Sequence, residues 1–298
     1  MKAPIAFVGT ATWDQIALVD RLPQSDQRIK ARDLLSCGGG PAANAAVSAQ
    51  VLGAPCLLIS CVGDDTTGKN IVDDLRRYSI GTQGIQIIHG GRSSNSLIQV
   101  ESTGLRTITY FGGVLAKYDL QAFPEQLIEQ CALVHADGNH PALTLKTFQL
   151  ARQYGKLTSL DGGNIPEDVL NTMLEFVDVF ITDVKSLPEA LRDMSLDEAC
   201  KELSKAGPRC VAITNGKHGC TMWTEEGIHT EPGIAVQVID TTGAGDDFHG
   251  AFAFGLWKGL SYDACLKLSN IFAAISCEGL GGRGKLLSFD ELEQKYLK

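Results

Sequence analysis

The stretch LVHADGNHPALTLKTFQLARQYGKLTSLD, residues 133–161, contains a short apolar run, a helical pattern and a second short apolar run. Apolar runs follow at residues 179–182 and 210–214, with helical patterns after Pro166 and at residues 196–206. Short buried strands that alternate with helices are typical of βαβ units, whose parallel sheet is covered by helices on both faces. The sequence therefore predicts an α/β fold with a doubly wound, mostly parallel sheet and ligand sites at the carboxyl ends of the strands.

The first third of the chain has the same rhythm, but segments in which apolar and polar residues alternate interrupt it. A hairpin turn at residues 102–104 joins the last two of three expected antiparallel strands, which are residues 29–36, 96–101 and 106–111. A small projecting sheet has a face to cover, so we expect a lid over a substrate or a contact between two copies of the chain. We expect the lid strands to lie within residues 10–37 and 92–113. The whole chain, residues 1–298, is expected to form one domain.

Composition limits the class of protein. The 298 residues are 44% hydrophobic and 20% charged, which predicts a globular chain with a large core. The formal net charge is -9, and the sequence has no run of Lys and Arg residues that could bind along a phosphate backbone. No nucleic acid is therefore expected as a partner. A signal-peptide pattern and apolar stretches of transmembrane length are missing, so we expect a cytoplasmic protein without a membrane partner. The 9 cysteines form no Cys-x-x-Cys pair, which predicts free thiols.

The segment DTTGAGD, residues 240–246, is the most informative motif. It lies between the apolar residues 235–239, expected to be a strand, and the apolar run at residues 252–257, expected in a helix. A glycine turn before a helix places free N–H groups and a positive dipole end at one point, which suits a phosphate. Asp246 could there accept the proton of an attacking hydroxyl. The alternative is that Asp246 only caps the helix and the glycines only form a turn.

This segment resembles, residue for residue, the C-terminal signature of the ribokinase-like (PfkB) carbohydrate kinases. GGPAAN, residues 39–44, resembles their Gly-Gly-x-x-x-Asn element, and the resemblance covers the whole chain. It implies ATP-dependent phosphorylation of a hydroxyl on a small sugar, with ATP and Mg²⁺ as cofactors. It also implies that Asp246 is the catalytic base. The implied anion hole for the transferred phosphoryl group consists of the N–H groups of Gly243, Ala244 and Gly245.

The resemblance also implies two ligand sites. A glycine lets the backbone approach a sugar, while a carboxylate and a carboxamide bind its hydroxyls. The residues implied in sugar binding are Asp14, Gly39, Gly40 and Asn44. For the nucleotide, a Thr-x-Gly-x-x-Gly segment lies along the phosphates, an asparagine lies near the adenine and the loop of residues 279–284 encloses the base. The residues implied in ATP binding are Thr214, Gly216, Gly219 and Asn270.

The chain departs from the family pattern in the motif that helps relatives to bind Mg²⁺. Relatives often carry Asn-x-x-Glu after the strand at residues 179–181, and this chain has Thr182-Asp183-Val184-Lys185 there. Lys185 stands in place of the glutamate, which leaves Asp183 as the candidate for the water shell of Mg²⁺. Asp240 resembles the residue that borders a monovalent-cation site in some relatives, where K⁺ is the expected ion.

Within the family, the likeness is greatest to kinases of ketohexoses and their modified forms, including sulfofructose kinase. A sulfonated or phosphorylated substrate needs a cation in the pocket, preferably a guanidinium. Arg28 could supply one, but Asn139 occupies the strand end where a second arginine would be useful. A neutral or mildly modified ketohexose-like sugar is therefore favoured, with an anionic sugar or a nucleoside as the alternative. His135 and His140 flank the same strand end.

Two other classes of protein remain. A catalytically silent sugar or nucleotide sensor could use the same fold, but the intact residues 243–246 argue against it, and an ATP turnover assay would separate the two. An oxidoreductase would need Gly-x-Gly-x-x-Gly in the first βαβ unit, where residues 9–14 read GTATWD. We therefore expect a sugar, ATP and a second copy of the chain, in a homodimer through the lid, as partners.

Overall fold

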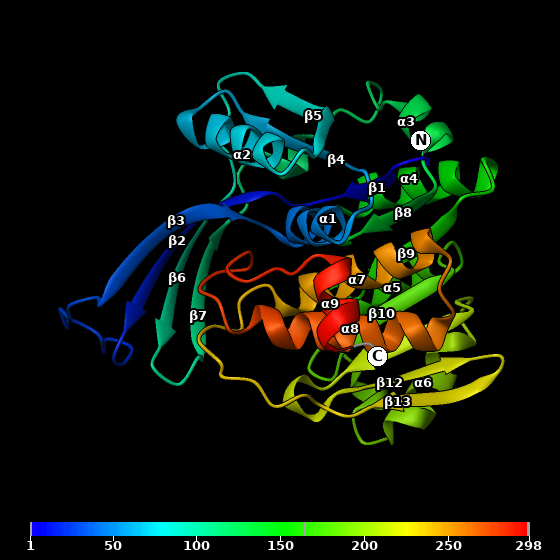
Figure 1. The fold of residues 1–298 in the computed structure, drawn as a ribbon. Coiled ribbons are helices and arrows are strands. Elements are labelled where there is room, and N and C mark those ends of the chain that lie inside the picture. Colours follow the sequence, from blue (N-terminus) through cyan, green and yellow to red (C-terminus); the bar gives the residue numbers. More distant parts are fainter. Residues whose placement is uncertain (1, 164, 297–298) are drawn as a thin grey trace.

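The computed structural model describes residues 2–163 and 165–296. In that part of the chain, a 9-stranded sheet has the order β13-β12-β11-β10-β9-β8-β1-β4-β5 (Figure 1). Neighbouring strands pair parallel, apart from the antiparallel pairs β11–β12 and β12–β13. The predicted doubly wound, mostly parallel sheet is confirmed. The strand bounds are Ile5–Val8 (β1), Cys56–Gly63 (β4), Gly81–Ile88 (β5), Leu133–Ala136 (β8), Leu157–Asp161 (β9), Val179–Asp183 (β10), Cys210–Thr214 (β11), Cys220–Thr224 (β12) and Gly227–Glu231 (β13).

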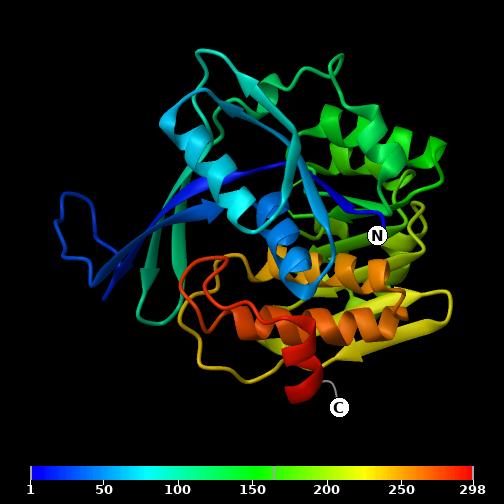
Figure 2. The ribbon, with the colours of Figure 1, turned by 45° about the horizontal axis from the view of Figure 1, so that its top comes forward.

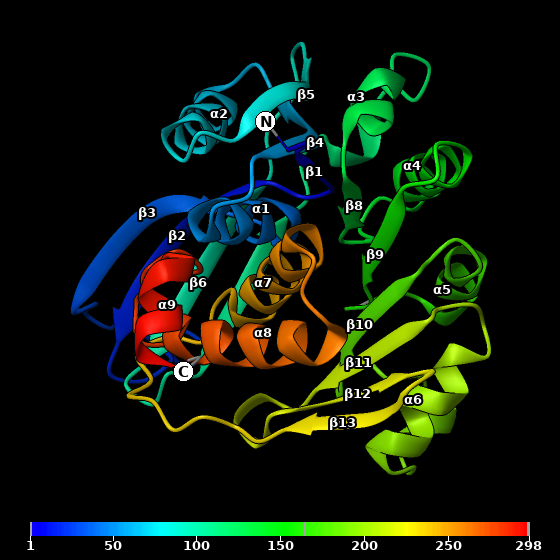
Figure 3. The same ribbon diagram turned by 45° about the vertical axis from the view of Figure 1, so that its right-hand side comes forward.

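Helices cover both faces of this sheet, as Figure 3 shows. Helices α1, α2, α7, α8 and α9 share a buried core with one face of β1 and β4. Helices α3 to α6 share a second core with the opposite face. The helix bounds are Pro41–Leu52 (α1), Thr66–Arg77 (α2), Glu125–Gln130 (α3), Pro141–Gln153 (α4), Glu167–Leu174 (α5), Leu196–Ser204 (α6), Ala244–Lys258 (α7), Tyr262–Ser276 (α8) and Phe289–Lys295 (α9).

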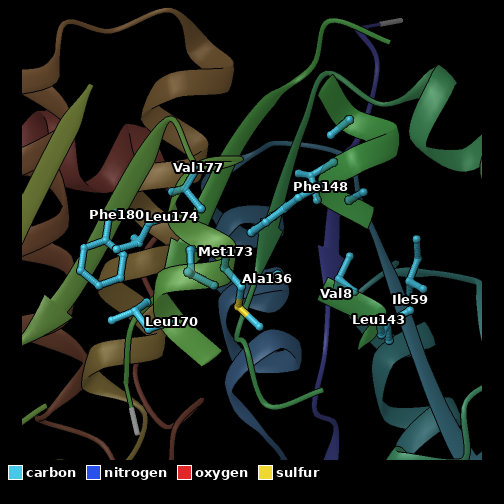
Figure 4. Packing of buried hydrophobic residues seen from close by; sticks show 14 of the residues in the cluster. Val8, Ile59, Ala136, Leu143, Phe148, Leu170, Met173, Leu174, Val177 and Phe180 are labelled. Atoms are coloured by element: carbon cyan, nitrogen blue, oxygen red, sulfur yellow. The ribbon is translucent and has the colours of Figure 1, made fainter. Parts of the chain in front are cut away.

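The strands of the main sheet are apolar because both of their faces are buried. All 8 residues of β4 are buried. Val8, Ile59 and Ala136 of neighbouring strands belong to the same cluster as Leu143 and Phe148 of α4 (Figure 4). Parallel strands that are buried on both sides have continuous apolar sequences, which is why they could be identified from the sequence.

The chain order of the strands reverses between β1 and β8, because β4 and β5 lie on one side of β1 and β8 to β13 on the other. Ligands of doubly wound sheets bind at such a point, beyond the carboxyl ends of the strands. Thr10 follows β1 and Asp137 follows β8, and the Thr10 N–H donates to Asp137 Oδ2 at 2.6 Å. This bond joins the two strand ends where the fold favours a ligand site.

A second sheet, which we call the lid, projects from the main body (Figure 2). Its order is β3-β2-β6-β7, with β2 parallel to β6 and the other pairs antiparallel. The predicted β6–β7 hairpin is confirmed, whereas the strand expected at residues 29–36 begins only at Asp33. β2 lies within the predicted lid range of residues 10–37, but the sequence did not predict it as a separate strand, because its buried positions include the polar Thr12 and Asp14. The bounds are Thr12–Val19 (β2), Asp33–Gly39 (β3), Asn95–Glu101 (β6) and Arg106–Phe111 (β7).

The strand expected at residues 235–239 is wrong, since this segment has no regular secondary structure. The Ile239 N–H donates to the Cys277 carbonyl at 2.8 Å, outside any sheet. Val238 lies against the tip of the lid, where a Cβ on Gly104 would be 2.7 Å from Val238 Cγ1. The apolar residues of this segment therefore serve a contact with the lid.

The described residues include no helix that is long and apolar enough to span a membrane. All cysteines in this part of the chain are free, as predicted, and all but Cys37 are buried. Burial raises the pKa of the Cys61 thiol to about 12, so this thiol stays protonated at neutral pH.

Candidate active site

A cleft of about 730 Å³ lies between the lid and the carboxyl ends of the main-sheet strands. The lid contributes Asp14, Ser96, Arg106 and Tyr110 to its lining. The body contributes Thr10, Gly40, Asn44, Asn139, Asp161, Asp183, Thr214, Gly216, Gly243, Gly245, Asp246 and His249. Residues that the sequence assigned to the sugar, the phosphate and the nucleotide thus meet in one cleft.

Asp246 lies in the first turn of α7 and is partly buried. Asn44 Nδ2 donates to Asp246 Oδ2 at 2.8 Å. Burial raises the pKa of Asp246 to about 6, the hydrogen bond from Asn44 lowers it, and the Asp161 carboxylate raises it. A carboxyl group with this pKa is mostly ionised at pH 7, so it can accept a proton from a hydroxyl.

The turn before Asp246 leaves empty space beside a free backbone N–H. Within the described residues, no oxygen accepts a hydrogen bond from the Gly245 N–H. A Cβ at Gly245 would have no atom within 4 Å, and its φ is not positive, so neither neighbours nor conformation require glycine there. A helix N-terminus with free N–H groups and open space suits an anion.

The assignment of Ala244 to the anion hole needs correction. Its N–H donates to the Thr241 carbonyl at 3.3 Å, and the residue does not line the cleft. Gly243 does line the cleft, and its φ of 79° forms the turn. A Cβ at Gly243 would lie 2.5 Å from Gly282 Cα, so the close approach of the loop at residues 279–284 requires glycine.

Three consecutive glycines before α1 make room for three different contacts. A Cβ at Gly38 would overlap a buried carboxylate, and a Cβ at Gly39 would lie 1.9 Å from Asp14 Oδ2. Gly40 has a φ of 94°, and a Cβ there would lie 2.6 Å from the Thr10 carbonyl oxygen. Gly40 lines the cleft, whereas Gly39 lies behind Asp14. Gly39 therefore makes space for a cleft residue instead of lining the cleft itself.

Asp14 presents a buried carboxyl group to the cleft from β2. Thr12 Oγ1 donates to Asp14 Oδ1 at 2.7 Å. Burial raises the pKa of Asp14, and hydrogen bonds from Thr12 and Ser96 lower it. Asp14 and Asn44 line the cleft together, and a carboxylate beside a carboxamide offers both acceptors and donors to the hydroxyls of a ligand.

Sequence reasoning missed Arg106 at the start of β7. Arg106 Nη1 donates to Thr241 Oγ1 at 2.6 Å, which links the lid to the turn before Asp246. Thr241 Oγ1 in turn donates to the Gly104 carbonyl at 3.4 Å. Arg106 lines the cleft and also lowers the pKa of Asp246. Nothing in the local sequence of an exposed hairpin singles out this arginine.

His249 and Asp161 form a second group that the sequence reasoning missed. His249 Nε2 lies 3.2 Å from Asp161 Oδ1, and both residues line the cleft. Burial alone would lower the pKa of His249, but the Asp161 carboxylate raises it above its usual value. Burial alone would raise the pKa of Asp161, but the nearby His249 lowers the pKa of Asp161 below its usual value. The position of His249, one helical turn after Asp246, was the available signal.

The end of the cleft that the sequence assigns to the nucleotide is built from turns at the ends of β10 and β11. Thr214 and Gly216 line it, and Thr214 Oγ1 donates to the Thr182 carbonyl at 3.3 Å. Gly216 has a φ of 53°, and a Cβ there would meet no atom within 4 Å. Lys185 also lines this end and is exposed. The sequence treated it only as a departure from a motif, but it places a positive charge in the cleft.

Gly219 and Asn270, which the sequence assigned to ATP, do not line the cleft. Gly219 has a φ of 93° between β11 and β12, and a Cβ there would lie 2.0 Å from the Glu231 carbonyl oxygen. Asn270 Nδ2 donates to the Pro232 carbonyl at 2.8 Å. Both residues hold neighbouring backbone in place, so the structure does not support direct contacts with the nucleotide.

The two candidate metal ligands are occupied by protein donors. Asp183 Oδ1 accepts the Lys185 N–H at 2.7 Å, and Asp183 Oδ2 accepts the Ser186 hydroxyl at 2.9 Å. Asp240 Oδ1 and Oδ2 accept backbone N–H groups at 2.8 Å each. In the described chain, no three His, Cys, Asp or Glu side chains gather where they could hold a metal ion. The described residues therefore form no all-protein metal site, and a role of Asp183, which lines the cleft, in the water shell of Mg²⁺ stays a prediction.

Arg28 is exposed in the loop between β2 and β3 and does not line the cleft, so its expected contact with an anionic sugar is not supported. Asn139 does line the cleft, and its N–H donates to Asp137 Oδ1 at 3.0 Å. Of the two histidines at this strand end, His135 is buried with its pKa lowered to about 3 by burial and by His249. His140 caps α4.

The model of the pfkB family carbohydrate kinases matches residues 2–287. The chain is 27% identical over 280 residues to an ATP-dependent ribose-1-phosphate kinase of Halopiger xanaduensis, covering 94% of this chain and 93% of the relative. It is 28% identical over 295 residues to ribokinase of Mus musculus, covering 94% and 90%. The structure of Arabidopsis thaliana ribokinase complexed with ribose and ATP has a TM-score of 0.83 at 21% identity, covering 99% and 98%. The chain therefore belongs to the pfkB family of carbohydrate kinases and is an ATP-dependent kinase of that family.

Proposed function

We propose that the protein transfers the γ-phosphoryl group of ATP to a hydroxyl of a small neutral sugar. The observation that carries this proposal is the juxtaposition of Asp246 with the empty space beside the Gly245 N–H. A general base and an anion site lie next to each other, as phosphoryl transfer to a hydroxyl requires.

In the proposed reaction the sugar oxygen attacks the γ-phosphorus while its proton passes to the Asp246 carboxylate. The bond between the phosphorus and the bridging oxygen breaks, and ADP leaves with that oxygen. The N–H groups of Gly243 and Gly245 would stabilise the charge on the transferred group. Mg²⁺, bound mainly through the ATP phosphates, would neutralise further charge. A K⁺ ion near Asp240 is retained only as an expectation from the family resemblance.

The sugar end of the cleft favours a neutral substrate. Asp14 is a buried carboxyl group, and its charge would repel a phosphate or sulfonate bound beside it. The relatives described above are named for ribose and ribose-1-phosphate, so we place a pentose ahead of the ketohexose that the sequence favoured. Arg106 is the observation that favours the alternative of a phosphorylated sugar, because it brings a guanidinium into the cleft.

The test is an ADP-release assay with the purified protein and a panel of ribose, fructose, ribose 1-phosphate and adenosine, at saturating ATP and Mg²⁺. A kcat/KM for ribose or fructose at least tenfold above the values for the other two compounds supports the proposal. Greater activity with ribose 1-phosphate would favour the alternative of a phosphorylated sugar. The absence of sugar-dependent ADP release with any neutral sugar would contradict the proposal.

We also propose a homodimer through the lid, formed by a single cytoplasmic kinase domain of residues 1–298. The outer face of the lid, opposite the cleft, is uncharged over most of its area, which includes Leu34, Leu97 and Thr109, and carries Glu101 at the end of β6. Two copies of such a face can meet with little like-charge repulsion. Light scattering should give the mass of a dimer for the wild type and of a monomer for Leu97→Lys. A monomeric wild type would rule the dimer out.

A further inference from the structure

A buried ion pair lies behind the catalytic end of the cleft. Arg283, in the loop of residues 279–284, bonds through Nη1 to Asp74 Oδ2 of α2. The two side chains are only 5% and 13% exposed. Neither residue lines the cleft, so the pair does not contact a ligand there directly.

The ion pair reaches the catalytic base through one side chain, that of Asn44. Arg283 Nε lies 2.9 Å from Asn44 Oδ1, and Asn44 Nδ2 lies 2.8 Å from Asp246 Oδ2. A guanidinium can only donate hydrogen bonds, so the amide must turn its oxygen toward Arg283. The amide nitrogen must then face Asp246, where it donates to the carboxylate.

The backbone next to these hydrogen bonds leaves space for the side chains that form them. A Cβ at Gly38 would lie 2.2 Å from Asp74 Oδ2 and 2.4 Å from Arg283 Nη1. A Cβ at Gly282 would lie 2.7 Å from Asn44 Nδ2. Two glycines from distant parts of the sequence therefore leave the volume that the ion pair and the amide occupy.

We propose that Arg283, held by Asp74, is a positioning residue that fixes the amide of Asn44 so that its nitrogen donates to Asp246. The inference rests on the proposed role of Asp246 as the base. A donor to the carboxylate stabilises its ionised form, which is the form that accepts a proton. The second hydrogen of the amide nitrogen remains for the sugar, because Asn44 also lines the cleft.

Other charged groups also act on Asp246, and a test must separate them from Arg283. Asp161 of β9 raises the pKa of Asp246, while His249 of α7 and Arg106 of β7 lower it. The neighbouring Asp247 is buried, accepts a hydrogen bond from Ser48 and has its pKa raised to about 8 by burial. None of these groups forms a hydrogen bond with Arg283 or Asp74 in the described part of the chain.

The test measures the pKa of Asp246 directly, by NMR of protein labelled with ¹³C at the aspartate carboxyl groups, with the signal assigned from its loss in Asp246→Asn. The main variant combines Asp74→Asn with Arg283→Met, which removes both charges together and leaves no unpaired buried charge. We expect the pKa of Asp246 to rise from about 6 by about one pH unit, the scale of losing a hydrogen bond to a charged group.

Two controls separate positioning from other roles. Lys285→Met breaks the ion pair with Glu278 on a neighbouring part of the same loop and should leave the pKa of Asp246 unchanged. Asn44→Ala should raise the pKa of Asp246 by a similar amount, and adding the main variant to it should add nothing further. Arg283→Lys, which keeps the charge, checks the result if the double variant does not fold.

An unchanged pKa of Asp246 in the main variant, or an equal shift with and without Asn44, would overturn the proposal. A lowered melting temperature without a pKa shift would show that the ion pair is only structural. These measurements do not need turnover. If no sugar of the panel causes ADP release but the pKa of Asp246 shifts in the main variant, only the proposed function is contradicted. If a sugar is phosphorylated but the pKa of Asp246 does not shift, only this inference is contradicted.

Discussion

The two ends of the cleft are held together in different ways. At the catalytic end, Asp246 and Asn44 belong to helices far apart in the sequence and are joined directly, with Arg283 behind them. At the nucleotide end, Asp183 binds the backbone of its own turn, and Thr214 binds the adjacent strand. The catalytic end is thus fixed by side chains of two helices around a partly buried carboxylate, whereas the nucleotide end is fixed within one turn and between adjacent strands and leaves Lys185 exposed. Substitutions at the first end should mainly change rates, and those at the second should change ATP affinity.

The largest effect is expected at the catalytic end. Asp246→Asn removes the proton acceptor with little change in shape, so kcat should fall by about two to four orders of magnitude while ATP binding stays nearly unchanged. Steady-state kinetics and ATP titration by calorimetry measure the two quantities. Retention of more than about a tenth of the wild-type kcat would remove Asp246 from the mechanism.

Asn44→Ala sharpens the comparison within the catalytic end. We expect the KM for the sugar to rise by about 5- to 150-fold, the equivalent of about 1–3 kcal/mol for an unpaired polar contact, with little change in the KM for ATP. The assay belongs at pH 8, where Asp246 remains ionised even if its pKa rises. If the variant instead raises the KM for ATP and leaves the KM for the sugar unchanged, the sugar end and the nucleotide end of the cleft have been assigned the wrong way round.

Arg106→Gln tests whether the hydrogen bond between Arg106 and Thr241 connects the lid to the catalytic end of the cleft. The variant loses a charge-assisted hydrogen bond between the lid and Thr241, so kcat should fall by about tenfold and hydrogen exchange at residues 102–106 should become faster. Exchange and kinetics that both match the wild type would mean that this bond does not form in solution. Lys117→Gln is a suitable control, since Lys117 is exposed and does not line the cleft.

The smallest effect is expected at the nucleotide end. Thr214→Val removes a hydroxyl but keeps the shape, so the KM for ATP should rise by about two- to tenfold with kcat nearly unchanged. Asn270→Ala should leave the KM for ATP unchanged if its amide only holds Pro232. An increase in the KM for ATP with Asn270→Ala alone would restore the sequence-based assignment.

The same difference between local and long-range contacts explains what the sequence could predict. The parallel strands and the hairpin of the lid have continuous or alternating apolar patterns, so their periodicity was sufficient. Asp246, Asn44 and Asp14 lie in segments that the family resemblance singles out, so they could be proposed from the sequence, and the structure brings them into one cleft. Arg106 and Arg283 act through contacts with distant segments, and no local pattern marks them. For His249, the only local signal was its position one helical turn after Asp246, because its partner Asp161 lies in a distant strand.

Local patterns were also misleading where apolar or glycine residues serve a tertiary contact. Residues 235–239 have the composition of a strand, but Val238 meets the tip of the lid. Gly219 belongs to a motif for phosphates, yet it is needed where the chain passes the Glu231 carbonyl. Asp183 and Asp240 have the right side chain for a metal, but their oxygens also accept hydrogen bonds from neighbouring N–H and hydroxyl groups. In each case the partner was not visible in the local sequence.

The most direct test of Asp246 as the general base is the pH dependence of kcat/KM for the sugar. Burial raises the pKa of Asp246 to about 6, so the carboxylate is ionised above that pH and protonated below it. The kcat/KM for the sugar, which reports ionisation in the protein without bound sugar, should be constant above about pH 7 and fall about tenfold per pH unit below pH 6. This acid limb should be absent from the residual activity of Asp246→Asn. A wild-type kcat/KM that stays flat from pH 5 to 8, or an acid limb that persists in the variant with the same midpoint, would contradict the assignment of Asp246 as the base.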